Sequence, residues 1–268
     1  AFPDMLRYQN QLGRAYVAAN RYFDALSVYR AAAEKGSAHA TLWVGNIYDR
    51  GLGVPKDEAE SARWYEKAAT QGSITAMYNL AISHSDRVSA GAEKEKNGAA
   101  AQKWFEAAAG LGMADAMYML AKSYERGNFT PKDRDKQIAW LKKAADFAFP
   151  DALNDLGYAY ISGEGVPKDE KKAREILRKA VDAGAVSARQ NLAHLYLFGL
   201  GGPVDKAEAK KLLEQGAAAN HIASLVYYGQ AQAAGMFGKI DKAAVRTLYA
   251  KAADLGDAKA KKLLGELK

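Results

Sequence analysis

The chain has 268 residues, no cysteine and a formal charge of +7. Without cysteine, a disulfide framework, a thiol nucleophile and a cysteine-ligated zinc site are excluded. No run of 18 apolar residues occurs, so the sequence predicts no membrane-spanning helix.

Small residues recur along the chain at a fixed period, which is typical of a repeat protein. One small position recurs in steps of 36 residues, with a single step of 40, at Ala40, Ala76, Ala116, Ala152, Ala188, Ser224 and Ala260. Such repeats stack on their neighbours and form one continuous body, here residues 1–268. The predicted repeats are residues 1–36, 37–72, 73–112, 113–148, 149–184, 185–220 and 221–256, followed by a terminal helix at 257–268.

Each repeat is predicted to contain two amphipathic helices, a first and a second. In residues 149–184, apolar spacing of three and four places Ala152 and Leu156 on one stripe of the first helix. Gly157 beside them lets another helix approach closely. The second helix of each repeat carries bulky residues such as Tyr65 one turn before small ones such as Ala69. This alternation predicts close packing of the two helices.

Polar residues mark the predicted starts of the second helices, and glycines mark their ends. Short acceptor side chains suited to an N-cap share one register at Asp57, Asn97, Asp133, Asp169, Asp205 and Asp241. Glycines suited to a left-handed C-terminal cap follow, with two replacements, at Gly36, Gly72, Gly112, Ala148, Gly184, Asn220 and Gly256. The four extra residues of repeat 73–112 are therefore predicted to lie in a loop from Ser83 to Asn97.

The pattern small-x-x-x-Leu-Gly-x-x-Tyr, then Gly-x-Gly-Val-x-x-Asp, then Ala-x-x-Trp-Tyr-x-Lys-Ala-Ala-x-x-Gly resembles the Sel1-like repeat, a relative of the tetratricopeptide repeat. Residues 37–72 follow it almost throughout. Residues 1–36 lack the Gly-x-Gly-Val turn and resemble a tetratricopeptide unit. The resemblance implies an all-α fold, a right-handed superhelical α/α solenoid of about seven helix-turn-helix repeats.

No motif points to catalysis, a metal or a cofactor. The four histidines, His39, His84, His194 and His221, show no metal-ligand spacing. His84 occupies the register of a packing tyrosine. The Gly-x-Gly turns follow helices rather than strands, so they are not dinucleotide-binding fingerprints. We expect no enzyme activity.

The excess positive charge lies mainly on the second helices and at the C-terminal end. A solvated outer face explains it, and a patch for an acidic partner is the alternative. Nucleic acid is disfavoured, because Asp169, Glu170 and Glu175 interleave with the basic residues.

Residues that the repeat does not require are the candidates for binding. In tetratricopeptide-like arrays the first helices line a concave groove. The predicted partner-binding groove residues are Tyr78, Tyr118, Tyr158, His39, Asn46, Asp49, Lys122, Glu125, Asp151, Asn154, Gln190 and His194. The three tyrosines are the predicted aromatic anchors. The alternative is that each of them only packs against the next repeat.

The resemblance implies a non-enzymatic, monomeric protein that binds another protein, as an adaptor, scaffold or regulator in a bacterial cell envelope. One alternative is an immunity protein that inhibits a secreted toxin or effector enzyme. Another is a peptidoglycan- or saccharide-binding protein. The implied location is the bacterial periplasm, with a lipid anchor on a longer precursor as a variant and the cytoplasm as the alternative.

Overall fold

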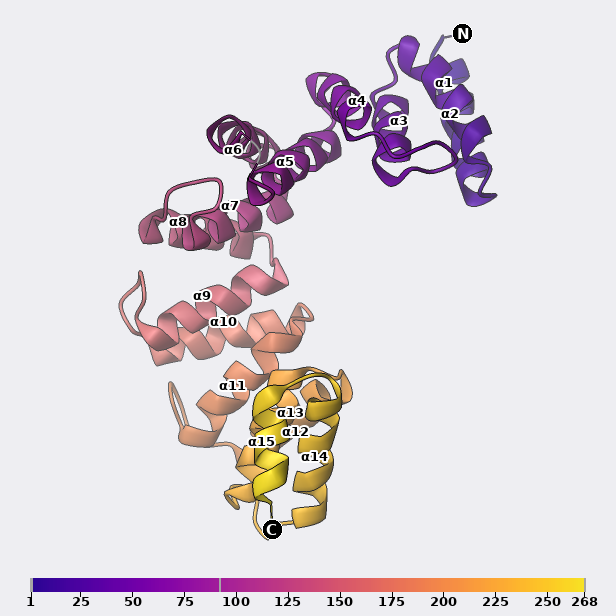
Figure 1. Ribbon diagram of the computed structural model, residues 1–268. Coiled ribbons are helices and arrows are strands. Elements are labelled where there is room, and N and C mark those ends of the chain that lie inside the picture. The colour runs from indigo at the N-terminus through magenta and orange to yellow at the C-terminus, as the bar shows by residue number, and fades with distance from the viewer. Residues whose placement is uncertain (1, 92, 268) are drawn as a thin grey trace. The chain divides into compact units, whose positions relative to one another are not determined.

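The computed structural model describes residues 2–91 and 93–267 and shows a protein built of paired α-helices (Figure 1). Over these residues the chain forms fifteen helices and no strand. Contacts divide it into two compact units, residues 1–133 and residues 134–268. The predicted all-α fold of stacked helix-turn-helix repeats, an α-solenoid, is confirmed.

Helices follow one another with short turns between them in both units. The helices of the first unit are α1 (Phe2–Ala18), α2 (Tyr22–Glu34), α3 (Ala38–Arg50), α4 (Glu58–Thr70), α5 (Ile74–Ser89), α6 (Lys94–Gly110) and α7 (Ala114–Arg126). Those of the second unit are α8 (Arg134–Asp146), α9 (Pro150–Ser162), α10 (Glu170–Asp182), α11 (Val186–Phe198), α12 (Lys206–Ala218), α13 (Ile222–Ala233), α14 (Lys242–Asp254) and α15 (Ala258–Glu266). Odd-numbered helices up to α13 are first helices, and even-numbered ones are second helices.

The two helices of a repeat pack through the predicted contact between a small and a bulky residue. A Cβ atom placed on Gly45 of α3 would lie 2.6 Å from the ring of Tyr65 on α4. A Cβ atom on Gly157 of α9 would lie 2.6 Å from Leu177 of α10. Tyr65 and Leu177 are both buried, so the glycine sets the distance at which the helices pack.

Replacing Gly45 by alanine should therefore lower the free energy of unfolding by about 1–2 kcal/mol, although alanine favours a helix over glycine by about 1 kcal/mol. The Tyr65 ring cannot move away freely, because its hydroxyl donates a hydrogen bond to Asn46. Gly110→Ala in α6 is the matched control, since a Cβ there meets nothing within 4 Å. Urea denaturation followed by circular dichroism measures both. Equal stability of the two variants would contradict the packing argument.

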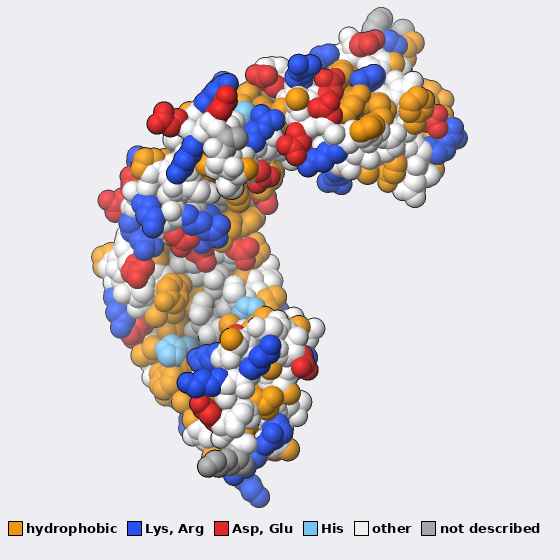
Figure 2. All heavy atoms as spheres, viewed as in Figure 1, with side chains coloured by type: hydrophobic (Ala, Val, Ile, Leu, Met, Phe, Trp, Pro, Cys, Tyr) orange, Lys and Arg blue, Asp and Glu red, His pale blue; other side chains and the backbone are white. Residues whose placement is uncertain are grey.

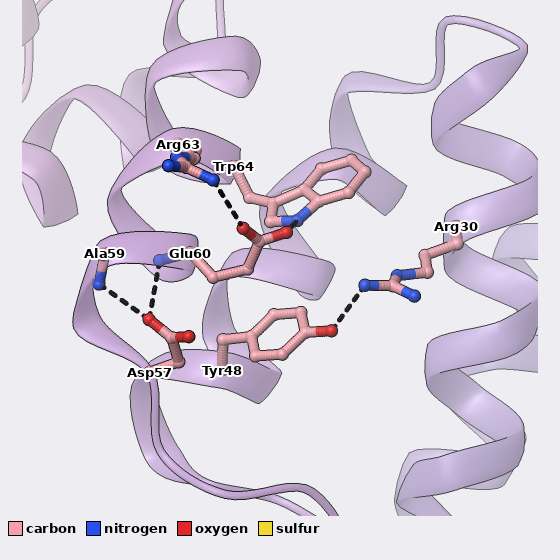
Figure 3. Close-up of polar contacts among 7 residues, drawn as sticks. All are labelled: Arg30, Tyr48, Asp57, Ala59, Glu60, Arg63 and Trp64. Atoms are coloured by element: carbon pink, nitrogen blue, oxygen red, sulfur yellow. Dashed lines mark hydrogen bonds and ion pairs between the residues drawn. The ribbon is translucent and has the colours of Figure 1, made fainter.

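Capping groups define the ends of the second helices largely as predicted. Asp57 Oδ1 accepts hydrogen bonds from the backbone N–H groups of Ala59 (3.0 Å) and Glu60 (2.9 Å) at the start of α4 (Figure 3). Asp169, Asp205 and Asp241 likewise accept backbone hydrogen bonds at the starts of α10, α12 and α14. The predicted left-handed residues have positive φ at Gly36, Gly72, Gly112, Ala148, Gly184, Asn220 and Gly256. The residue after each donates back to the carbonyl five positions earlier, as Ser73 does to Ala68 at 3.0 Å.

The predicted N-cap at Asn97 and the predicted loop from Ser83 to Asn97 are wrong. The extra residues lengthen two helices instead, because α5 continues to Ser89 and α6 begins at Lys94. Asn97 is buried inside α6, where its Oδ1 lies 2.9 Å from Nδ1 of the half-buried His84. Ala92 lies outside the described residues.

Arginine–tyrosine pairs join successive repeats. Arg30 on α2 donates to the hydroxyl of Tyr48 on α3 at 2.5 Å (Figure 3). Arg178 on α10 donates to the hydroxyl of Tyr196 on α11 and also pairs with Glu208 at 3.0 Å. The recurring tyrosine of the first helix is therefore a polar contact between repeats as well as a packing residue.

The second glycine of each Gly-x-Gly turn also contacts the preceding repeat. A Cβ on Gly53 would lie 2.9 Å from Tyr22 on α2, and one on Gly165 would lie 2.7 Å from Arg134 on α8. At Gly201 the distance to the backbone oxygen of Glu170 would be 2.2 Å. Because the preceding helix leaves no room for a side chain, this turn helps to set the stacking of one repeat on the next.

Candidate functional site

A cleft of about 560 Å³ opens in the first unit between α3, the turn that follows it, and α5. Three of the predicted groove residues line it, namely Asn46, Asp49 and Tyr78. We call it the Asn46 cleft. Its other lining residues are Arg50, Lys56, Glu58, Tyr65, Asn79, Ile82, Ser83, Asp86, Arg87 and Ala90.

The base of the Asn46 cleft is a fixed polar group. Asn46 Oδ1 accepts a hydrogen bond from the Tyr65 hydroxyl at 2.8 Å and another from Asn79 Nδ2 at 3.3 Å. Burial raises the pKa of Tyr65 to about 12, and the negative charge of Asp49 acts in the same direction. The phenol therefore remains a donor at neutral pH. Both of these hydrogen bonds within the described residues use Oδ1, so the Asn46 amide nitrogen can donate to a bound molecule.

Charges of both signs line the rim of the cleft. Lys56 and Glu58 form an exposed ion pair of 2.8 Å, while Asp86 and Arg87 lie one position apart on α5. Figure 2 shows the same mixture over the visible face, with Lys and Arg interspersed among Asp and Glu. A mixed rim suits a ligand that carries both signs of charge, as a polypeptide surface does.

Tyr78 is a packing residue of its own repeat that also lines the cleft. Its ring is half-buried and packs edge-on against Phe105 of α6, with the ring centroids 5.7 Å apart. Burial raises the pKa of Tyr78, and Asp115 adds to the effect. The ring thus packs within its own repeat and also forms part of the wall of the cleft.

The structure places the predicted residues of α7 outside the Asn46 cleft. Lys122 forms an ion pair with Glu125 one turn along the helix. The Lys122 ammonium also lies 5.9 Å from the ring centroid of the half-buried Tyr118. These three residues form a local cluster on one helix.

In the second unit the predicted residues lie on α9 and α11. Asn191 of α11 donates to Asn154 Oδ1 of α9 at 3.0 Å, and Asp151 is exposed at the start of α9. Tyr158 is 53% exposed, so of the three predicted anchors it offers the largest free fraction of its surface. It is available as an anchor.

The remaining predicted residues of this unit face α13. His194 Nδ1 lies 2.8 Å from the hydroxyl of Tyr227, and the His194 ring packs on Phe198. Burial lowers the pKa of His194. Gln190 lines a separate cleft of about 850 Å³ that also includes Tyr227. The twelve predicted residues therefore occupy several separate places.

His39 lies in a third cleft, of about 610 Å³, at the N-terminal end of the first unit. Its Nε2 accepts a hydrogen bond from Arg14 Nε at 3.3 Å. Burial lowers the pKa of His39, and the positive charge of Arg14 lowers it further. The neutral imidazole is thus favoured as the acceptor.

Sequence reasoning missed the lining residues Tyr65, Asn79 and Asp86. Tyr65 was assigned to the core because its position is bulky in every repeat, and Asn79 precedes the core leucine of its helix. Only the hydrogen bonds of Asn46 reveal that the two belong to the cleft. The available signal was the hydroxyl of Tyr65 in a register that Leu141, Leu177 and Leu213 fill in other repeats.

No metal-binding arrangement is found in the part of the chain that the structure describes. Among residues 2–91 and 93–267, no three histidine, aspartate or glutamate side chains come together as metal ligands would. None of the helices described is both long and apolar enough to cross a lipid bilayer. The site offers hydrogen bonds, charges and aromatic surface, which is the chemistry of reversible binding.

Comparison with known proteins identifies the repeats. The Sel1 repeat family matches residues 38–73, 74–113, 114–146, 150–184, 186–221 and 246–257. A short region of 64 residues is 36% identical to the ERAD-associated E3 ubiquitin-protein ligase component HRD3A of Arabidopsis thaliana. That region covers 24% of this chain and only 9% of the plant protein.

Two solved structures are similar over nearly the whole chain. The Escherichia coli protein c5321, described as a protective antigen present in uropathogenic strains, is 26% identical with a TM-score of 0.83. The match covers all of this chain and 59% of that one. A Sel1 repeat protein of Oxalobacter formigenes is also 26% identical, with a TM-score of 0.76 over 98% of this chain and 76% of the other. The chain belongs to the Sel1 repeat family.

Proposed function

We propose that this protein is a non-enzymatic interaction module that binds a partner protein through its first helices, with the Asn46 cleft as the main site. Sel1 repeats typically mediate contacts between proteins, which supports the general class. The observation that carries the specific site is the orientation of Asn46 by Tyr65 and Asn79. An amide fixed before binding loses little conformational entropy when a partner arrives.

The chemistry of the cleft favours a polypeptide over a small molecule. Asn46 and Asn79 offer amide groups, which complement the N–H and C=O groups of a peptide backbone. Tyr78 offers an aromatic surface, and the rim offers both signs of charge. Aromatic anchors surrounded by polar groups are typical of protein interfaces.

The proposed role is an adaptor, scaffold or regulator in a bacterial cell envelope. The similar protein c5321 is described as a protective antigen. We take that description as support for the proposed envelope location. The chain spans about three fifths of that protein (59%), so its partner and its role remain part of the proposal.

Reversing the charges on α5 should weaken partner binding and leave the fold intact. The variant Asp86→Lys with Arg87→Glu changes two residues of the cleft rim, and its net charge is unchanged. We expect at least a tenfold loss of affinity, because like charges then face the partner. The measurement is capture of envelope proteins from the source cell on immobilised protein, followed by calorimetry with the purified captured protein.

The matched control is Lys142→Glu with Asp146→Lys, which reverses one base and one acid on the exposed face of α8. It should bind like the wild type. If Asp86→Lys with Arg87→Glu binds the partner as tightly as the wild type, the interface lies elsewhere on the protein.

The same experiments distinguish the alternative roles. If the captured protein is a toxin that loses activity when bound, the role is that of an immunity protein. Saturable binding of a peptidoglycan fragment in calorimetry would indicate saccharide binding instead, provided that Asp86→Lys with Arg87→Glu abolishes it.

A further inference from the structure

Two arginines on α1 have no acidic partner. Arg7 and Arg14 are both exposed, and the described residues supply neither with a carboxylate. They are seven positions apart on a helix, so they share one face with their backbones about 10 Å apart. Both line the N-terminal cleft of about 610 Å³, which we call the Arg14 cleft.

The rest of the Arg14 cleft is neutral. Its polar lining consists of Asn10, Gln11, Ser37 and His39, without an aspartate or glutamate. Asp4 precedes Arg7 by one turn of α1 and does not line the cleft. The Asn46 cleft differs, since Asp49, Glu58 and Asp86 balance its basic residues. Of these two clefts, the Arg14 cleft is therefore the one with an excess of positive charge in its lining.

Arg14 is oriented by a hydrogen bond that leaves its terminal nitrogens available. Its Nε donates to Nε2 of the half-buried His39 at 3.3 Å. The two Nη groups of the guanidinium form the planar pair of donors that matches a carboxylate. Fixing the Nε end reduces the freedom that the side chain must lose on binding.

The packing of the repeat does not explain Arg14. Arg14 and Asn46 occupy the same register, two positions after the half-buried Leu12 and the buried Val44. Asn46 accepts a hydrogen bond from the buried Tyr65 hydroxyl. The equivalent buried hydroxyl, that of Tyr29, has no hydrogen-bond partner in the described structure. Arg14 is thus turned toward His39 and the cleft, and a core phenol is left unsatisfied.

We propose that the Arg14 cleft binds an acidic peptide segment, with Arg7 and Arg14 each pairing with a carboxylate of the same chain. Two anchors about 10 Å apart suit two acidic side chains three residues apart on a peptide in the polyproline II conformation, which advances about 3.1 Å per residue and has about three residues per turn. Asn10 and Gln11 lie between them in the sequence of α1 and offer amides to the peptide backbone. The inference names a class of partner segment for the proposed interaction module, and so it rests on that proposed function.

A labelled peptide tests the site without knowledge of the natural partner. Fluorescence anisotropy with a fluorescein-labelled hexaglutamate peptide should show saturable binding that weakens as salt is added. Hexaglutamine should not bind. Arg7→Gln with Arg14→Gln should weaken hexaglutamate binding at least tenfold, whereas Lys142→Gln with Lys171→Gln, which removes the same charge from exposed lysines of the second unit, should change it less than twofold.

Two further measurements make the result specific. Arg7→Lys with Arg14→Lys keeps the charge and removes the planar donor pair, so it should weaken binding several-fold. The proposal would be overturned if Arg7→Gln with Arg14→Gln binds hexaglutamate as tightly as the wild type. It would also be overturned if Lys142→Gln with Lys171→Gln loses as much affinity as the arginine variant. So would a short oligothymidine that binds more tightly through the same arginines, since the ligand would then be nucleic acid. If hexaglutamate binding fails these tests but Asp86→Lys with Arg87→Glu still weakens binding of the captured partner, the proposed function is retained and only the Arg14 cleft inference is overturned.

Discussion

Replacing Phe105 by alanine should lower the free energy of unfolding by about 3–5 kcal/mol. Phe105 is fully buried in the first unit, where its ring stacks on Phe129 with centroids 5.3 Å apart. The edge of Tyr78 also rests on it. Removal of the ring leaves a cavity between α5 and α6 that the neighbouring side chains cannot fill.

The loss should be local, because the stability of a repeat protein is roughly a sum over repeats and their nearest-neighbour interfaces. Hydrogen exchange followed by mass spectrometry should show faster exchange in α5, α6 and α7 of Phe105→Ala than in the wild type. Urea denaturation gives the total change in free energy. A change below about 1 kcal/mol would show that this ring is not a packing centre of the first unit.

Phe105→Leu separates stability from binding. A buried leucine of similar volume should cost less than about 1.5 kcal/mol. It nevertheless removes the aromatic surface against which Tyr78 packs. If Tyr78 contacts the partner in the Asn46 cleft, partner affinity should fall several-fold in this variant while the protein stays folded. Unchanged partner affinity would mean that Tyr78 does not contribute to binding.

The repeat pattern predicts most of this fold because each of its signals acts over a short stretch of chain. A glycine two residues past a helix, or an aspartate just before one, is recognised without knowledge of distant contacts. The Asn97 prediction failed because register alone cannot distinguish a lengthened helix from a lengthened loop. His84 and Asn97 pair across the extended helices α5 and α6, and no local pattern encodes that contact.

The candidate site could be predicted from the sequence less completely than the fold. Three residues of the first-helix register, Asn46, Asp49 and Tyr78, line one cleft. It could not show that Lys122 and Glu125 pair with each other, or that Tyr65 donates from a core position to Asn46. Side-chain pairing depends on rotamers and on the approach of neighbouring helices, which a repeat period leaves undetermined.

The same limit applies to the glycine turns, and Gly201→Ala tests what the sequence could not show. In the sequence, the Gly-x-Gly pattern is identified only as a turn that follows a helix. In the structure Gly201 has a φ of +71°, and a Cβ there would lie 2.2 Å from the Glu170 carbonyl oxygen in the first turn of α10. Since the obstacle is backbone, it cannot rotate away as a side chain could.

We therefore expect Gly201→Ala to destabilise the second unit by about 3 kcal/mol or more, as strain from the left-handed conformation adds to the clash with α10. Gly235→Ala is the control for conformation alone. Its φ is +68°, and the nearest atom to its Cβ would be 3.5 Å away, so its cost should be about 1–2 kcal/mol. The difference between the two variants in urea denaturation measures the contact between the turn and the preceding repeat. Equal costs would mean that this glycine serves only its own turn, and that the stacking of repeats depends on the helices alone.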